Sequence, residues 1–254
     1  MCHLDSTAPP VPDGVGEYPE RTGGPDPVPY LRAESAGTGP AAATIVLITD
    51  IYGINPFYRH LAGVLAGDGY RVIIPDVFHR VGPAADASRD AAQARRRLLD
   101  DGLAVDDIER VLDQVTSGNR QYGVLGFCIG GSFALLTAAS RPQQATVTYY
   151  AFPKGAPGAV LPATEPLKVA DAIAGPVLAH WGRQDYIDPA EITQLARALE
   201  AAPGPAEVRW YDPAGHAFLA GLTDPGHEAA AAAADSWERT VRFFREHLGL
   251  PPRG

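Results

Sequence analysis

The sequence predicts an α/β fold, with a mainly parallel sheet of about seven or eight strands and helices on both faces. Short apolar runs rich in β-branched residues recur along the chain, and stretches with apolar residues at helical spacing separate them. The runs show no alternation of apolar and polar residues, which is typical of strands buried on both faces. The expected strands are 43–49, 70–75, 122–127, 145–150, 176–181 and 207–211.

Helices are expected between these strands, because apolar residues recur there at the spacing of one helical face. Asn55-Pro56 opens the first helix, and Gly67 and Gly69 close it. The segment 132–140 follows its strand directly and is interpreted as a buried helix. The other helices are marked by Ile108, Val111, Leu112 and Val115 with an end at 117–119, by Ile192, Leu195, Ala196 and Leu199, and by Trp237, Val241, Phe244 and Leu248.

The N-terminal residues differ from the rest in composition. Residues 1–28 are rich in proline and glycine and show little periodicity. That composition predicts an arm laid over the domain or a partly disordered tail. Residues 29–254 then form one domain, since α/β folds of this size usually remain undivided.

Charge and composition exclude several classes of protein. The chain has 254 residues, of which 30 are acidic and 21 basic, for a net charge of −9. No basic patch for nucleic acid or for an anionic membrane is indicated. The chain lacks a run of about 18 apolar residues, and its start lacks the features of a secretory signal. Cys2 and Cys128 are not expected to form a disulfide, which fits a reducing compartment. We expect a cytoplasmic monomer or homodimer that acts on a small molecule.

The clearest chemical motif surrounds Cys128. The segment YGVLGFCIGGSFALL (122–136) predicts a strand, a G-x-C-x-G-G turn and a helix. Gly126 and Gly130 permit a turn so tight that the cysteine projects above the sheet. The helix N-terminus stabilises a thiolate and lowers its pKa, and the amide of Ile129 points where an oxyanion would form. A cysteine among apolar residues is more often a small buried hydrophobe, but this context favours a nucleophile.

Seven histidines compete for the role of general base. His216 lies in a loop after the strand 207–211 and before the last helix, where it can reach groups at the carboxyl end of the sheet. His79 follows a strand end and remains a candidate pocket residue. A loop histidine can also be purely structural. The others fall in the arm, on helices, inside a strand or at the start of the last helix: His3, His60, His247, His180 and His227.

The acid that orients the histidine is sought in the segment HWGRQDYIDPAEI, which offers Asp185 and Asp188. Asp188 precedes Pro189 and lies three residues before Glu191, the signature of a helix N-cap with a capping box. Its structural role is thereby explained. Asp185 lies just beyond the strand 176–181 and can accept the imidazole N–H. Asp185 is therefore the preferred candidate.

Three blocks, GFCIGG, WGRQDYIDP and AGHAF, resemble in this order the triad blocks of the dienelactone hydrolase (carboxymethylenebutenolidase) family, within the α/β-hydrolase superfamily. The block 49–80 also resembles that family, so the likeness covers roughly residues 28–248. It implies the α/β-hydrolase fold and hydrolysis of an ester or lactone through a thiolate and an acyl-enzyme. It also implies an oxyanion hole made by the amides of Ile129 and Ile51.

The resemblance assigns further residues to the site. Asp50 stands where the family has a glutamate that helps to activate the thiol; a strand-end aspartate can instead cap a turn. The family holds a substrate carboxylate with two arginines, and Arg80 matches one, whereas Ala220 stands in place of the other. Tyr52 and Phe78 are candidates for lining the pocket, with an ordinary core position as the alternative.

Three functions of different kinds follow from these residues. The first is a cysteine-dependent hydrolase of a small ester or lactone, with a triad of Cys128, Asp185 and His216. It needs no metal or organic cofactor, and the sequence has neither a phosphate-binding glycine loop nor a Cys/His ligand cluster. The second is a catalytically silent, ligand-binding member of the same fold. The third is a redox role for Cys128, against which the absence of a C-x-x-C motif argues.

Overall fold

The computed structural model of the chain describes residues 8–36, 41, 43–116 and 121–249. Its centre is an eight-stranded sheet in the order β1-β2-β4-β3-β5-β6-β7-β8. β1, β2 and β4 pair antiparallel, and the remaining pairs are parallel, which confirms the expected mainly parallel sheet. The strands are β1 (Val15–Arg21), β2 (Pro29–Ser35), β3 (Thr44–Ile48), β4 (Arg71–Pro75), β5 (Tyr122–Phe127), β6 (Gln144–Tyr149), β7 (Val177–Gly182) and β8 (Ala206–Tyr211).

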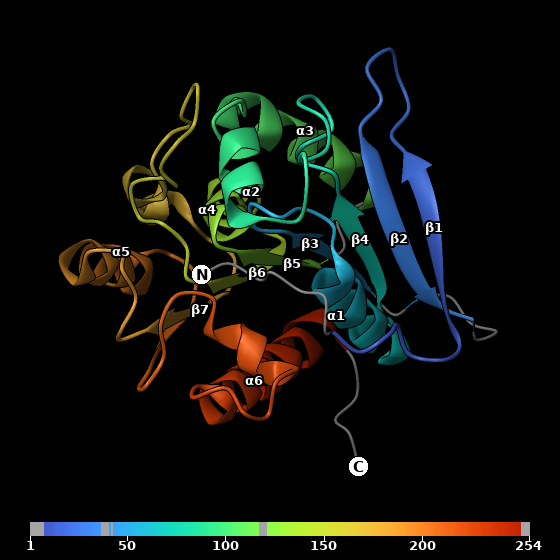
Figure 1. The fold of residues 1–254 in the computed structure, drawn as a ribbon. Coiled ribbons are helices and arrows are strands. Elements are labelled where there is room, and N and C mark those ends of the chain that lie inside the picture. The colour runs from blue at the N-terminus through green and yellow to red at the C-terminus, as the bar shows by residue number, and fades with distance from the viewer. Residues whose placement is uncertain (1–7, 37–40, 42, 117–120, 250–254) are drawn as a thin grey trace.

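Helices cover both faces of this sheet, as expected. Figure 1 shows α1 and α6 on one face and α3 and α4 on the other. Apolar residues fill the space on each side: Leu61 and Phe244 belong to one core cluster, Ile108 and Val111 to a second. The helices are α1 (Pro56–Gly67), α2 (Arg89–Arg96), α3 (Asp101–Val115), α4 (Ile129–Ala138), α5 (Pro189–Ala201) and α6 (Ala230–Leu248), with short 3₁₀ turns η1 (Pro166–Lys168), η2 (Ala170–Ala172) and η3 (Phe218–Leu222).

β1, β2 and α2 were not expected from the sequence. Residues 15–21 form β1, where only an irregular arm was predicted. Its side chains are half-buried or exposed and it contains Pro19, so it lacks the apolar pattern of a central strand. β1 pairs with β2 along its whole length, from Val15 opposite Ser35 to Arg21 opposite Pro29. α2 was missed because only Ala92 and Arg96 of its side chains are buried, too few to give a helical period.

Some expectations fall outside the described residues. These are the helix end at 117–119, the positions of Cys2 and His3, and residues 1–7 of the predicted arm. Cys128 forms no disulfide with another described residue. None of the helices in the described ranges is long and apolar enough to cross a membrane.

The topology brings the candidate residues to one edge of the sheet. β3, β5, β6, β7 and β8 are joined as parallel neighbours, so their carboxyl ends lie side by side. Ligands and reacting groups of open α/β sheets lie at this edge. Asp50 follows β3, Cys128 follows β5, Asp185 follows β7 and His216 follows β8.

Candidate active site

Cys128 lies in a turn with an uncommon backbone conformation, between β5 and α4. Its φ is 57° and its ψ is −119°, and only 1% of its surface is exposed. The turn requires glycine on both sides. A Cβ on Gly126 would lie 2.2 Å from the carbonyl oxygen of Gly130, and a Cβ on Gly130 would lie 2.4 Å from that of Ile48. The two glycines thus let helix, strand and turn approach one another closely enough to form the elbow.

The elbow also places the cysteine at the N-terminus of a buried helix. Cys128 is the N-cap of α4, and its carbonyl accepts hydrogen bonds from Gly131 at 3.0 Å and Ser132 at 3.2 Å. The amide of Ile129 is the first of the helix, and the first amides of a helix have no acceptor within the helix. The dipole of the helix favours negative charge at this point, so a thiolate or an oxyanion here is stabilised.

The loop after β3 faces the same edge and is tightly folded. The carboxylate of Asp50 accepts a hydrogen bond from the amide of Tyr52 at 2.8 Å, and the carbonyl of Asp50 accepts one from Gly53 at 3.1 Å. Asp50 is fully buried and Ile51 is 5% exposed. The carboxylate of Asp50 therefore caps a turn and is also buried, just after the end of β3 that contacts the elbow at Gly130.

The structure brings Asp185 and His216 together. Nδ1 of His216 lies 3.0 Å from both carboxylate oxygens of Asp185, and 1% of each side chain is exposed. The amide of Ile187 donates a further hydrogen bond to Asp185 at 3.0 Å. Asp188 instead accepts from the amide of Ala190 at 2.8 Å and caps α5. A carboxylate on Nδ1 fixes the tautomer in which Nε2 can accept a proton.

Close backbone contact between two loops holds this pair in place. A Cβ on Gly182, at the end of β7, would lie 2.1 Å from the carbonyl oxygen of Ala214. The amide of Gln184 donates to the same carbonyl at 2.9 Å, and that of Arg183 donates to Tyr211 at 2.9 Å. The loop bearing the acid and the loop bearing the histidine are therefore one hydrogen-bonded unit.

Aromatic rings surround the imidazole of His216. The ring centroids of Tyr186, Tyr150 and Phe152 lie 4.6, 4.9 and 5.4 Å from that of His216. Tyr150 is fully buried and has a φ of 43°, which a bulky residue adopts only under constraint. The sequence offered no signal for these rings, since they come from two loops.

The segment after β6 is held by hydrogen bonds on several sides, which explains how the strained conformation of Tyr150 persists. It lies between the elbow and the imidazole, so it connects the two. The bonds are Cys128 N–H to Tyr149 O at 3.0 Å, Tyr150 N–H to His180 O at 2.8 Å, Trp181 Nε1–H to Ala151 O at 3.0 Å and Phe152 N–H to Ser132 Oγ at 2.9 Å.

Arg95 of α2 reaches the loop after β3, a contact the sequence did not suggest. Its Nη2 donates to the carbonyl of Ile51 at 2.7 Å, and its guanidinium lies 4.0 Å above the ring of Phe78. Desolvation by burial lowers the pKa of Arg95 from its usual value. Arg95 and Tyr52 line a cavity of about 460 Å³, whereas Phe78 is 1% exposed beneath the guanidinium.

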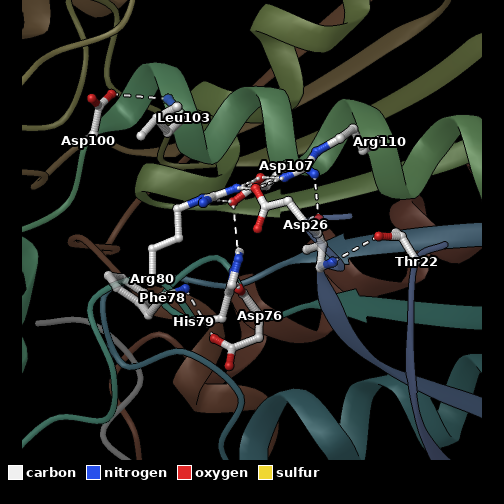
Figure 2. A network of polar contacts seen from close by, with 11 residues as sticks. Thr22, Asp26, Asp76, Phe78, His79, Arg80, Asp100, Leu103, Asp107 and Arg110 are labelled. Atoms are coloured by element: carbon white, nitrogen blue, oxygen red, sulfur yellow. Dashed lines mark hydrogen bonds and ion pairs between the residues drawn. The ribbon is translucent and has the colours of Figure 1, made fainter. Parts of the chain in front are cut away.

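Arg80 is occupied by carboxylates. Its Nε and Nη2 donate to the two oxygens of Asp107 at 2.7 and 2.8 Å, and Nη2 also donates to Asp26 at 2.5 Å. Figure 2 shows this network, in which Arg110 pairs with both aspartates and His79 approaches Asp107. The hydrogen bonds that Arg80 donates to Asp107 and Asp26 raise its pKa further. The network joins the β1–β2 loop and the loop after β4 to α3.

His180 and His60 have structural environments. His180 in β7 is fully buried, with Nδ1 3.1 Å from the Tyr211 hydroxyl and Nε2 3.3 Å from that of Thr240. Burial lowers the pKa of His180 to about 3, so it stays neutral. His60 contacts the carbonyl of Pro10 at 3.2 Å. In the part of the chain that the structure describes, no group of three or more acidic, histidine or cysteine side chains is placed to hold a metal ion.

A candidate nucleophile follows β5, an acid follows β7 and a histidine follows β8. This is the chain order and placement of the α/β-hydrolase fold. The protein has that fold. Residues 31–248 match the family model described as the dienelactone hydrolase family. The chain therefore belongs to this family, and it is a hydrolase of ester bonds.

Individual relatives agree with this placement. A carboxymethylenebutenolidase of Rhodococcus opacus is 62% identical over 248 residues, which cover 98% of each chain. A carboxymethylenebutenolidase of Pseudomonas putida is 31% identical over 80% of this chain and 85% of its own. Among solved structures, a Klebsiella pneumoniae protein assigned as a dienelactone hydrolase is similar with a TM-score of 0.77 at 26% identity, covering 91% of this chain and 99% of that one.

Proposed function

We propose that this hydrolase cleaves a small ester or lactone through a covalent acyl-enzyme on Cys128. One observation carries the proposal: a cysteine held in an elbow at a helix N-terminus shares its sheet edge with a buried His216–Asp185 pair. The name of the R. opacus relative describes a butenolide, which is an unsaturated lactone. An unsaturated lactone or ester is accordingly the substrate class we assign to this chain.

The first half of the reaction forms the acyl-enzyme. Before the attack, the thiol proton of Cys128 moves to Nε2 of His216. The Cys128 thiolate then attacks the carbonyl carbon, and the electron pair of the C=O bond moves onto oxygen. The amides of Ile129 and Ile51 are the proposed donors to that oxyanion, each worth roughly 3 kcal/mol when well placed. The C–O bond then breaks, and the leaving alkoxide takes a proton from His216. In a lactone the alcohol stays attached to the acyl group.

The second half releases the acid. Nε2 of His216 removes a proton from water, and the resulting hydroxide attacks the thioester carbonyl. Collapse of the second tetrahedral intermediate breaks the C–S bond and regenerates the Cys128 thiolate. Asp185 holds Nδ1 of the imidazole throughout and stabilises its protonated form. A nucleophilic thiol requires a reducing compartment, so we place the reaction in the cytoplasm.

Asp50 is proposed to assist formation of the thiolate. It is a buried carboxylate at the end of β3, whose last carbonyls contact the elbow at Gly130. An aspartate that only caps the turn to Tyr52 could be replaced by asparagine, since an amide oxygen accepts the same hydrogen bond. Charge and proton affinity would be lost in that substitution, so the two roles are separable.

We propose that Arg95, and not Arg80, binds a carboxylate on the substrate. The resemblance pointed to Arg80, but its Nε and Nη2 already donate to Asp107, and Nη2 also donates to Asp26. Nη2 of Arg95 donates to the carbonyl of Ile51, and its buried Nε has no hydrogen-bond partner within the described residues. It also lines the cavity together with Tyr52. Displacing an internal carboxylate from Arg80 would cost more than filling open donor positions on Arg95.

The alternative of a silent, ligand-binding member has less support. It would leave the strained conformation of Cys128 and the enclosed His216–Asp185 pair without a role. A redox role would need a resolving thiol near Cys128, and Cys2 lies outside the described residues.

Replacing Cys128 or His216 by alanine should abolish ester turnover. Removal of either group eliminates the nucleophile or its base, so we expect kcat to fall by a factor on the order of 10⁴ or more. For Cys128→Ala the free energy of unfolding in urea should change by less than about 2 kcal/mol, because the thiol fills only a small volume. The matched control is Cys2→Ala, for which full activity is expected. Near-normal hydrolysis by Cys128→Ala would refute the assignment of the nucleophile.

Asp50→Asn tests the proposed activation of the thiol. We expect the rate of acylation by an activated ester, measured in the pre-steady state, to fall roughly 10²-fold, because asparagine keeps the hydrogen bond to Tyr52 but cannot take a proton. Asp224→Asn is the matched control, since Asp224 makes the same kind of turn contact to Gly226 at 3.0 Å on the surface. An unchanged acylation rate for Asp50→Asn would leave Asp50 with a turn-capping role alone.

A pair of esters separates the two arginines. Monomethyl succinate carries a carboxylate, and dimethyl succinate is its neutral counterpart. For Arg95→Gln we expect KM for the monoester to rise about tenfold or more relative to that for the diester, since a charge-assisted contact of roughly 1.5–3 kcal/mol is lost. Arg80→Gln should leave that ratio within about twofold. The assignment fails when Arg80→Gln, and not Arg95→Gln, changes the ratio.

A further inference from the structure

Tyr186 occupies a conspicuous position that the proposed reaction does not use. It directly follows Asp185 in the loop between β7 and α5, and it is 60% exposed. Its ring centroid nevertheless lies 4.6 Å from that of His216, whose side chain is only 1% exposed. The ring therefore separates the imidazole from solvent on one side.

The other two rings at His216 are buried. Tyr150 is fully buried and Phe152 is 7% exposed, and the centroid of Phe152 lies 6.2 Å from that of Tyr186. Tyr150 and Phe152 therefore form the inner part of the enclosure, and Tyr186 forms its outer part. Among these three rings, Tyr186 presents the largest surface to a molecule arriving from solvent.

The chemistry of His216 determines which part of a substrate comes near Tyr186. Protonation of the leaving oxygen requires that oxygen to lie about 2.6–3.2 Å from Nε2 of His216. The ring of Tyr186 packs against this same imidazole. The atoms bonded to the leaving oxygen therefore come close to the imidazole against which the ring of Tyr186 packs. The acyl part is held on the other side of the carbonyl carbon, at Cys128.

We infer that Tyr186 is a specificity-determining residue that binds the alcohol part of the substrate and favours planar, unsaturated alcohols such as phenols and enols. Aromatic and conjugated groups gain from offset or edge-to-face contact with a ring, whereas a saturated ring of similar size gains only from burial. The inference depends on the proposed function, because His216 has to serve as the proton donor to the leaving group.

The test compares three esters on wild type, Tyr186→Leu and Tyr186→Phe. Phenyl acetate and cyclohexyl acetate differ in the planarity of the alcohol part, and methyl benzoate carries its planar ring on the acyl part. For Tyr186→Leu we expect kcat/KM for phenyl acetate to fall about 3- to 10-fold relative to wild type. The values for the other two esters should stay within about twofold. Each ester is compared with itself, so the differing reactivity of the leaving groups cancels.

Tyr186→Phe should retain the wild-type preference, because it keeps the ring and removes only the hydroxyl. Tyr18→Leu is the matched control: Tyr18 is 44% exposed on β1 and carries Arg32 over its ring, away from the site. An equal loss of kcat/KM on all three esters would mean that Tyr186 only holds His216 in position, and it would overturn the inference. No loss on phenyl acetate, or a wild-type enzyme that cleaves cyclohexyl but not phenyl acetate, would also overturn it. Retained turnover by Cys128→Ala is the separate result that would refute the proposed function itself.

Discussion

The backbone of Cys128 is the constraint on which the rest of the site depends. A residue with a φ of 57° and a ψ of −119° is strained by roughly 1–3 kcal/mol, and surrounding contacts have to supply that energy. They do so through close packing that excludes side chains at Gly126 and Gly130, and through a hydrogen bond from Cys128 to the end of β6. The result is a thiol at a helix N-terminus, at the edge of the sheet where the loops of β3, β7 and β8 also lie.

Strain and enclosure are concentrated around the same few atoms. Among the described residues, the non-glycine positions with positive φ are Cys128, Tyr150 and Ala217. The first is the proposed nucleophile, the second packs its ring on His216, and the third follows His216 in the chain. A buried imidazole between a carboxylate and aromatic rings has few orientations open to it. Preorganisation of this kind lowers the cost of aligning the proton with the leaving oxygen.

The sequence predicted those elements that are determined by residues close together in the chain. Gly126 and Gly130 mark the elbow because the turn cannot form with side chains there, and the loops bearing Asp185 and His216 follow recognisable buried strands. The pairing of Asp185 with His216 was inferred from chain order, and the structure places Nδ1 3.0 Å from the carboxylate. β1, β2 and α2 were not predicted because they contact distant parts of the chain: β1 pairs with β2, β2 pairs with β4, and Arg95 of α2 donates to Ile51 in the loop after β3.

Contacts between distant segments could not be inferred from the sequence. Arg80 meets Asp107 across 27 residues and Asp26 across 54, and Arg95 meets Ile51 across 44. No local pattern distinguishes a paired surface arginine from one that faces a cavity. The rings of Tyr150 and Tyr186 likewise approach His216 only after the sheet has brought three loops together. These residues decide how a substrate is held, so substrate preference was less accessible from the sequence than the reaction type.

The proposed reaction passes through a covalent thioester on the sulfur of Cys128. Rapid acid quench of the enzyme with an excess of phenyl acetate, followed by intact-mass and peptide mass spectrometry, tests it most directly. We expect one acetyl group per chain, located on the peptide that contains Cys128, with Asp185→Asn slowing its formation and its hydrolysis. Turnover of the ester without any adduct on that peptide, or with the acetyl group on another residue, would contradict an acyl-enzyme on Cys128.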